Sequence, residues 1–573
     1  MRFNALCIYC LLLVMLAACN TAPAAPAPAQ INKHVSSPLL GPYASTPPAS
    51  QARSGSLVLA DRQFPDAVNP LFSGSSVDFE LQPALWAAPV FVDSHFHVQP
   101  DQLTEVPLPE NGDVRDNGKT IIMHLRHDLR WSDGQPILSQ DFRYWWQLDQ
   151  NPDTGALNID GYNQIASIDT PDNYTVILHL KQPYGPYLSY LPYAAPLHAW
   201  GHLRPIDLQN MTSILLAPTV TDGPYKLAGY VNGQSFTLVP NSNYHSSTFR
   251  GPFLSQLVFR AYTSLTSLRA AIQAGQVDVS EGYMEYELPG LAHLPTGIHV
   301  LETPAASYEH LDFNLANPLF QDTNVRLAIQ IAIDKCALVR EVLHVSDCAR
   351  VADQVEPLPS LYNDPAIAPS TYNPVIARKL LARAGWLPGS RGILTKQGKP
   401  FVLRLVTTAD NPLRAAAAAL IQRDLQAVGI QVNVQYYPLN LFFAVYSRGG
   451  ILATGAYDLA MFGYQNSPEP DDEYGVFHSS QIPTASQPDL GNYGRINDPV
   501  IDEALTMGRY TVPFAQRVQA YHRFLQQLAS QVYLIPLYSG VNIITVSDRA
   551  QNIQPNPDVI NNNWNIADWW VKG

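Results

Sequence analysis

Two pairs of histidines come nearest to a metal-binding pattern in this chain. His95 and His97 occupy alternate positions, which share one face of a strand, and His124 and His127 form the second pair. Neither pair is accompanied by further ligands at the spacings typical of zinc sites. We therefore interpret these histidines as surface or half-buried residues, and we expect no metal and no other cofactor.

Sequence motifs for catalysis are missing after residue 18, where there is no GxSxG elbow, no HExxH, no P-loop, no GxGxxG and no CxxC. The acidic run Glu469–Glu473 could attract a cation, but we interpret it as a solvated loop. We therefore expect a protein that is not an enzyme. An acid pair that meets only in space would escape this search, so a secreted hydrolase stays open as an alternative.

The cysteines indicate at most one disulfide in the folded body. Cys7 and Cys10 stand in an apolar leader, while Cys336 and Cys348 are 12 positions apart. In an oxidising compartment a crosslink over such a loop is worth about 3 kcal/mol, and we expect it to form. Two free buried thiols are the alternative, since cysteine is a common core residue.

Length and charge exclude several classes of protein. The chain has 573 residues, 46% hydrophobic and 14% charged, which predicts three or four domains with substantial cores. The formal charge is -13, and without the first 18 residues it is 34 minus 48, or -14. A body of that charge repels nucleic acid and acidic lipid headgroups, so we expect no nucleic-acid partner.

The first residues have the three-part layout of a secretory signal: Arg2, an apolar run over 5–16, and small residues before Cys19. The stretch Leu16–Cys19 also resembles a bacterial lipobox, which implies loss of residues 1–18 and lipidation of Cys19. We expect a protein outside the cytoplasm, anchored to a membrane surface by lipid. An ordinary signal or an uncleaved anchor is the alternative.

Residues 19–53 are rich in alanine and proline, which predicts a semi-rigid tether between the anchor and the body. No later stretch has the roughly 18 uninterrupted apolar residues that a membrane span requires.

Short β-branched runs alternate with helical patterns from residue 54 onward, which is typical of α/β layers. Strands are expected at 56–60, 120–125, 174–180, 236–239, 254–261, 401–406, 430–437, 457–463 and 534–546. Helices are expected at 325–344, 374–385 and 414–428. The stretch 401–437 predicts a βαβ unit with parallel strands, whose following loops, 407–411 and 464–468, are candidates for ligand contact.

The segment 125–142 reads LRHDLRWSDGQPILSQDF. It is similar to the LRxxxxWSDGxPxTAxDV signature of the family 5 extracellular solute-binding proteins, the dipeptide, oligopeptide and nickel receptors of ABC importers. Further short matches follow in the order of that family, at 170–176, 223–225, 241–244, 275–278, 313–314, 325–334, 377–386 and 535–538. The resemblance extends from about Ser54 to Trp570.

This resemblance implies an α/β, two-lobed periplasmic-binding-protein-like fold of type II, cluster C, with an extra inserted domain. Lobe one is expected from three pieces, 54–82, 190–305 and 533–573. The inserted domain is expected at 83–189 and lobe two at 306–532. The lobes are expected to close on a solute, and an ABC permease in the membrane then accepts the solute from the monomeric receptor. A sensory or adhesion lipoprotein on the same fold is a further alternative.

In family members that take peptides, the ligand pairs its backbone with the protein like an added strand, and its side chains enter wet pockets. The resemblance therefore implies an oligopeptide as the solute. The positions that match the family's cleft are Ser73, Gly74, Ser75, Ser76, Tyr308, Asn411, Tyr464, Asn466 and Tyr538.

Asn466 departs from the family, whose peptide binders commonly carry an aspartate there for the α-ammonium of the peptide. A neutral amide forfeits a charge-assisted bond worth roughly 1.5 to 3 kcal/mol. Either Glu469 or Asp471 supplies the charge from the same loop, or the solute lacks a free amine, as an oligosaccharide or a metal chelate does.

Overall fold

A ten-stranded sheet is the central element of the computed structural model, which describes residues 37–49, 53–157, 161–356, 360–558 and 562–572. Its order is β17, β16, β18, β12, β19, β11, β1, β10, β9, β8. Their bounds in chain order are β1 Ser56–Asp61, β8 Tyr225–Val231, β9 Ser235–Pro240, β10 Gln256–Ala261, β11 Val279–Ser280, β12 Ile298–Phe313, β16 Val402–Thr408, β17 Gln431–Tyr437, β18 Leu459–Gln465 and β19 Leu534–Ser547. Over these residues, none of the helices has the length and apolarity needed to cross a bilayer.

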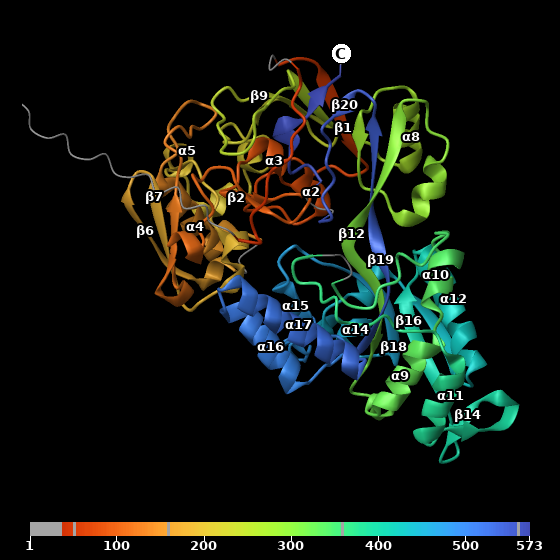
Figure 1. Ribbon diagram of the computed structural model, residues 1–573. Helices are drawn as coiled ribbons and strands as arrows, with labels where there is room; N and C mark the ends of the chain where they lie inside the picture. Colours follow the sequence, from red (N-terminus) through yellow and green to blue (C-terminus); the bar gives the residue numbers. More distant parts are fainter. Residues whose placement is uncertain (1–36, 50–52, 158–160, 357–359, 559–561, 573) are drawn as a thin grey trace, which may run out of the picture. The chain divides into compact units, whose positions relative to one another are not determined.

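Two long antiparallel strands, β12 and β19, connect two groups of elements, as Figure 1 shows. Their register shifts between Pro304 and Tyr308. The two largest clusters of buried apolar side chains divide along these strands. One cluster draws mainly on residues 57–279 and 544–569, and the other on residues between 308 and 538. Two separate cores joined by shared strands are the arrangement that allows two lobes.

The predicted βαβ unit is present. Strand β16 pairs in parallel with β17, and helix α12 (Pro412–Ala427) connects them. The helix ends before Gly429, whose φ of 91° suits glycine. The helix begins at Asn411, whose side chain accepts hydrogen bonds from the backbone of Leu413 and Arg414 at 3.0 and 3.1 Å.

The single helix predicted at 325–344 is wrong, because the chain forms two helices there. Helix α9 covers Thr323–Ala332 and helix α10 covers Lys335–Glu341. Between them Asp334 acts as a new N-cap, with its carboxylate accepting from the backbone N–H of Ala337 at 2.9 Å. The apolar spacing continues across the break, so periodicity alone could not locate it.

Replacing Asp334 by alanine is expected to lower the free energy of unfolding by about 1 kcal/mol, because the first turn of α10 loses its cap. Urea denaturation measures this. Asp410→Ala, at an exposed position, is the matched control and is expected to leave stability unchanged within about 0.5 kcal/mol. Equal stabilities for the two variants would contradict the assigned cap.

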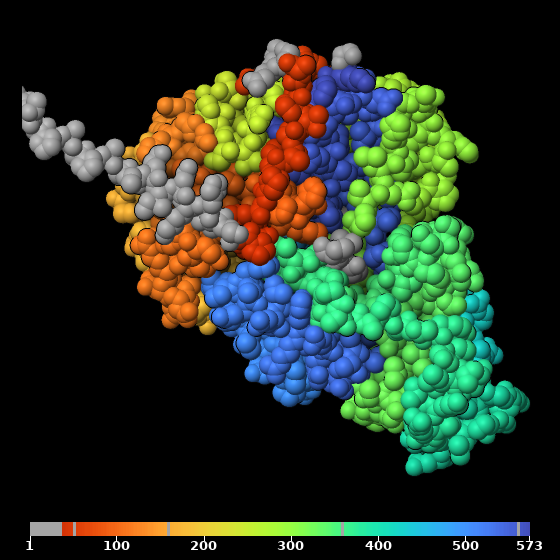
Figure 2. All heavy atoms as spheres, in the orientation of Figure 1, coloured from red at the N-terminus to blue at the C-terminus, as the bar shows by residue number. Residues whose placement is uncertain are grey.

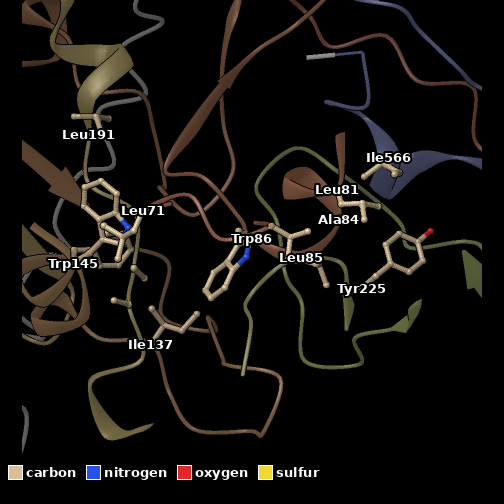
Figure 3. Close-up of a cluster of buried hydrophobic side chains, with 14 of the residues drawn as sticks. Leu71, Leu81, Ala84, Leu85, Trp86, Ile137, Trp145, Leu191, Tyr225 and Ile566 are labelled. Atoms are coloured by element: carbon tan, nitrogen blue, oxygen red, sulfur yellow. The ribbon is translucent and has the colours of Figure 1, made fainter. Parts of the chain in front are cut away.

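A second, four-stranded sheet lies within the residues expected to form the inserted domain. Its order is β4, β5, β7, β6, covering Val114–Arg115, Thr120–His124, Thr175–Leu180 and Ile165–Asp172. Helix α4 (Ser139–Asp149) contributes Trp145 to the core. The core is continuous with that of the large sheet, and Figure 3 shows both parts of it, with Trp145 and Leu191 on one side and Leu85 and Tyr225 on the other.

Two local predictions concern the chain outside these sheets. Cys336 and Cys348 are joined by a disulfide, with Cα atoms 5.1 Å apart.

The expected tether is partly wrong, because residues 37–49 pack on the body through several hydrogen bonds and form the red band on the surface in Figure 2. The predicted signal, the lipidated Cys19 and the rest of the tether up to residue 36 lie outside the described residues.

Candidate functional site

A cavity of about 600 Å³ lies between the two cores. Its walls come from the first core, from the four-stranded region, and from loops of the second core. The first core and the four-stranded region contribute the aromatic lining residues Phe79, Trp86, Phe91, Phe249, Trp564, Trp145, Tyr162, Tyr187, Tyr190 and Tyr193. Those of the second core include Leu361, Tyr362, Ser467, Pro468, Glu469 and Arg517. The volume lies within the range of roughly 300 to 1,000 Å³ that is typical of ligand sites, and aromatic side chains dominate the lining.

Tyrosines at every third position provide much of one wall. Tyr184, Tyr187, Tyr190 and Tyr193 are spaced by three residues, and the 3₁₀ helix η5 covers Gly185–Tyr190. A 3₁₀ helix has three residues per turn, so this spacing gathers side chains on one face. The last three tyrosines line the cavity. Burial raises the pKa of Tyr193 to about 12, so its hydroxyl remains a neutral donor.

The two acidic residues that were candidates for amine binding are already paired within the second core. Glu469 accepts from Arg517 at 3.0 Å, and the same guanidinium donates to the hydroxyl of Tyr362 at 2.8 Å. Asp471 pairs with Arg509 at 2.7 Å and accepts from Tyr184 at 3.0 Å. The expectation that either carboxylate is available for a solute ammonium is therefore not supported, because each charge is matched by an arginine.

Asn466 is buried, and its amide donates hydrogen bonds to two further carboxyl groups. Its Nδ2 donates to the backbone oxygen of Val355 at 2.8 Å, to Glu473 at 3.2 Å and to Glu356 at 3.3 Å. Burial first, then the charge of Asp472, raises the pKa of Glu356 to about 8, and burial with the same neighbour raises that of Glu473 well above its usual range. The amide at 466 thus serves a cluster of carboxyl groups that stay protonated near neutral pH.

Tyr308 and Tyr464 lie side by side on neighbouring strands, with ring centroids 6.0 Å apart. Tyr464 also stacks on His310 at 4.8 Å, and Tyr308 is 2% exposed. The Tyr308 hydroxyl has no hydrogen-bond partner among the described residues. Tyr538 lies on β19, buried, with the pairs Glu309–Arg414 and Glu285–Arg350 nearby.

The serines after β1 form a turn rather than part of the cavity wall. Ser73 is buried and donates to the backbone oxygen of Asn69 at 2.9 Å. The backbone N–H groups of Gly74 and Ser75 donate to Asp78 at 2.9 Å, and Ser76 begins helix α2 (Ser76–Glu80).

None of the nine predicted contact residues is among those that line the cavity within the described chain. Asn466 is adjacent to the lining residue Ser467, and the others lie on strands β12, β18 and β19 or at the starts of helices α2 and α12. Their direct contact with a solute stays a prediction. The tyrosines of the wall were missed, although their three-residue spacing was visible in the sequence.

The charged lining groups give the cavity an acidic character. They are four carboxyl groups and one guanidinium: Asp101, Glu110, Glu469, Asp558 and Arg517. Asp101 is buried and accepts from the hydroxyl of Tyr244 at 3.0 Å. Burial raises its pKa to about 7, so a cation placed beside it would favour the ionised form.

An aromatic cavity between two cores that share long strands defines a protein built to enclose a small solute. The chain matches the family model described as bacterial extracellular solute-binding proteins, family 5, over residues 97–483. It therefore belongs to that family, whose members are extracellular binding proteins rather than enzymes. The predicted membership, the two-lobed α/β fold class and the role as a solute-binding receptor are confirmed.

Known relatives extend the match over nearly the whole chain. The oligopeptide-binding protein AppA of Bacillus subtilis is 24% identical over 531 residues, which cover 91% of this chain and 92% of AppA. The nickel-binding periplasmic protein of Escherichia coli is 25% identical over 448 residues, 75% of this chain and 80% of the relative. The solved structure of B. subtilis AppA with a nonapeptide has a TM-score of 0.68 at 22% identity, covering 92% of this chain and all of AppA, 100%.

Proposed function

We propose that this protein binds an oligopeptide-type solute in the aromatic cavity and delivers it to an ABC permease. The observation that carries the proposal is the cavity itself, because both cores contribute to its walls. A solute that touches both walls makes more contacts when the lobes are closed than when they are open. This difference in contacts shifts the equilibrium toward the closed form. No bond in the solute is broken, which distinguishes the receptor from a hydrolase.

The proposal includes attachment to a membrane surface through a lipidated Cys19. The lipobox-like stretch Leu16–Cys19 and the proline-rich segment after it support this attachment. A permease in the same membrane would then remain within reach of the receptor. Without a permease the same fold would serve as a sensory or adhesion lipoprotein.

The acidic lining favours solutes with positive charge over solutes with negative charge. The lining contains four carboxyl groups and one guanidinium, and the guanidinium of Arg517 is paired with Glu469. We infer that a peptide's ammonium group is not received by position 466, where the amide of Asn466 is occupied by Val355, Glu356 and Glu473. The names of relatives include both oligopeptide and nickel ligands, so a metal chelate is the second candidate for the solute.

Peptide pools test this proposal through thermal unfolding. Purified protein, unfolded and refolded to remove any resident solute, is mixed with pools of lysine-containing, neutral or glutamate-containing pentapeptides. The lysine pool is expected to raise Tm most, because its positive charge suits the acidic lining. A ligand at a hundredfold excess over Kd stabilises the folded protein by about 2.7 kcal/mol. The glutamate pool is expected to have the smallest effect.

Mass analysis of the same mixtures separates the alternatives. Intact peptides after incubation agree with a receptor, whereas cleaved peptides would support the hydrolase. No rise in Tm with any pool, together with a rise for nickel chelated by histidine, would replace the peptide by a chelate.

A further inference from the structure

Residues 37–49 form what we call the N-terminal strap, and it is fixed to the body along its length. The hydroxyl groups of Tyr43 and Ser45 both donate to the buried carboxylate of Asp568 at 2.9 Å. The indole of Trp570 donates to the backbone oxygen of Thr46 at 2.7 Å. The other oxygen of Asp568 accepts from the backbone N–H groups of Arg250 and Gly251 at 2.9 and 2.8 Å, so the strap is held to an already ordered part of the fold.

The beginning of the strap reaches the cavity. Ser37 and Leu39 belong to its lining, beside Val98 of strand β3 (Val98–Pro100). The backbone N–H of Val98 donates to the oxygen of Leu39 at 2.7 Å, and the side chain of Gln99 donates to the oxygen of Gly41 at 2.8 Å. These bonds hold Leu39 in a defined place in the wall.

The middle of the strap supports the aromatic part of the same wall. The ring of Tyr43 makes edge contacts with Phe249 at 5.5 Å and Trp564 at 5.7 Å, and both of these rings line the cavity. Phe91 stacks on Phe249 at 4.5 Å and lines the cavity as well. The strap therefore contributes both a lining side chain and the packing behind two lining rings, one of which stacks on a third.

We propose that the N-terminal strap is one wall of the solute cavity and that Leu39, with the neighbouring aromatic rings, receives a bulky apolar group of the solute. The proposal rests on the proposed function, since it assigns a specificity subsite within the same cavity. Leu39, Phe91, Phe96, Val98, Phe249 and Trp564 give this end of the cavity an apolar surface. Burial of one large apolar side chain there is expected to raise affinity roughly ten- to hundredfold.

Leu39→Trp tests the proposal by filling the subsite. The probes are two neutral pentapeptide pools that differ only in carrying phenylalanine or glycine at one position. With unchanged protein the phenylalanine pool is expected to bind at least tenfold more tightly than the glycine pool. In Leu39→Trp this preference is expected to fall to less than threefold.

Ala44→Trp is the matched control. Ala44 is an exposed residue of the same strap and does not line the cavity, so this variant is expected to keep the preference of the unchanged protein. A second variant, Leu39→Ala, enlarges the subsite and is expected to weaken binding of the phenylalanine pool about three- to tenfold with little change in Tm.

The outcomes separate this inference from the proposed function. If neither these pools nor the lysine-containing pool binds the unchanged protein, the proposed function fails. If both pools bind but Leu39→Trp keeps the full preference for phenylalanine, the strap is not part of the subsite and the inference is wrong.

Discussion

Arg517→Ala is expected to lower the free energy of unfolding by about 3 to 5 kcal/mol, because it leaves a largely buried carboxylate without its partner. Arg517 is 4% exposed, and its guanidinium donates to Glu469, to the hydroxyl of Tyr362 and to the backbone oxygen of Gly508. It also forms part of the cavity wall. Urea denaturation at neutral pH measures the loss, and solute binding is expected to fall with it.

Arg523→Ala is the matched control on the same helix, α17 (Phe514–Gln531). Arg523 pairs with Glu503 at 2.7 Å, but the two side chains are 46% and 58% exposed. A surface pair of this kind is worth about 0 to 1 kcal/mol. The double variant Arg517→Ala with Glu469→Ala is expected to recover part of the stability lost in Arg517→Ala. A loss in Arg517→Ala no larger than that in Arg523→Ala would contradict the buried pair.

Glu356→Gln is expected to stabilise the protein by about 2 to 4 kcal/mol at pH 8 and to have little effect at pH 4. The folded protein raises the pKa of Glu356 from 4.5 to about 8, so it keeps a proton that the unfolded chain has lost over this range. The contribution of this carboxyl group to the free energy of unfolding is therefore fully present below pH 4.5 and declines as the pH rises toward 8. Glutamine is neutral throughout and removes the decline.

Denaturation of the two proteins at several pH values between 4 and 8 measures this difference. Glu503→Gln, at an exposed carboxylate, serves as the control and is expected to show no such dependence on pH. If Glu356→Gln is less stable than the unchanged protein at pH 8, the carboxyl group is ionised in the fold and the assignment is wrong.

The framework of the fold was predictable because local patterns and tertiary packing agree there. The glycine at 429, the strands on either side of α12 and the strand predicted at 534–546 all agree with the structure, whereas the long partner strand β12 was not among the predicted strands. Family membership was also predictable, since many short motifs follow one another in a fixed order over the chain. Each motif marks a turn or a core position rather than a contact with a solute.

The cavity wall was harder to predict, because its members meet only in space. Tyr187 and Tyr362 are far apart in sequence, and no local signal joins them. Contact of Asn466 with a solute stays a prediction, and the hydrogen bonds from its amide to two buried carboxyl groups were not predictable, because the position of those groups depends on tertiary packing. Composition alone predicts a tether over the strap, because it cannot show that Tyr43 and Ser45 share the carboxylate of Asp568.

Native mass spectrometry of the protein purified gently from its host tests the central claim most directly. A receptor that encloses a solute between two lobes is expected to carry a non-covalent mass, which is released intact on unfolding and identified as peptide. Refolded protein should recover the same mass when the released material is returned. If no adduct is found, and no peptide added afterwards is retained, the protein does not act as a peptide receptor.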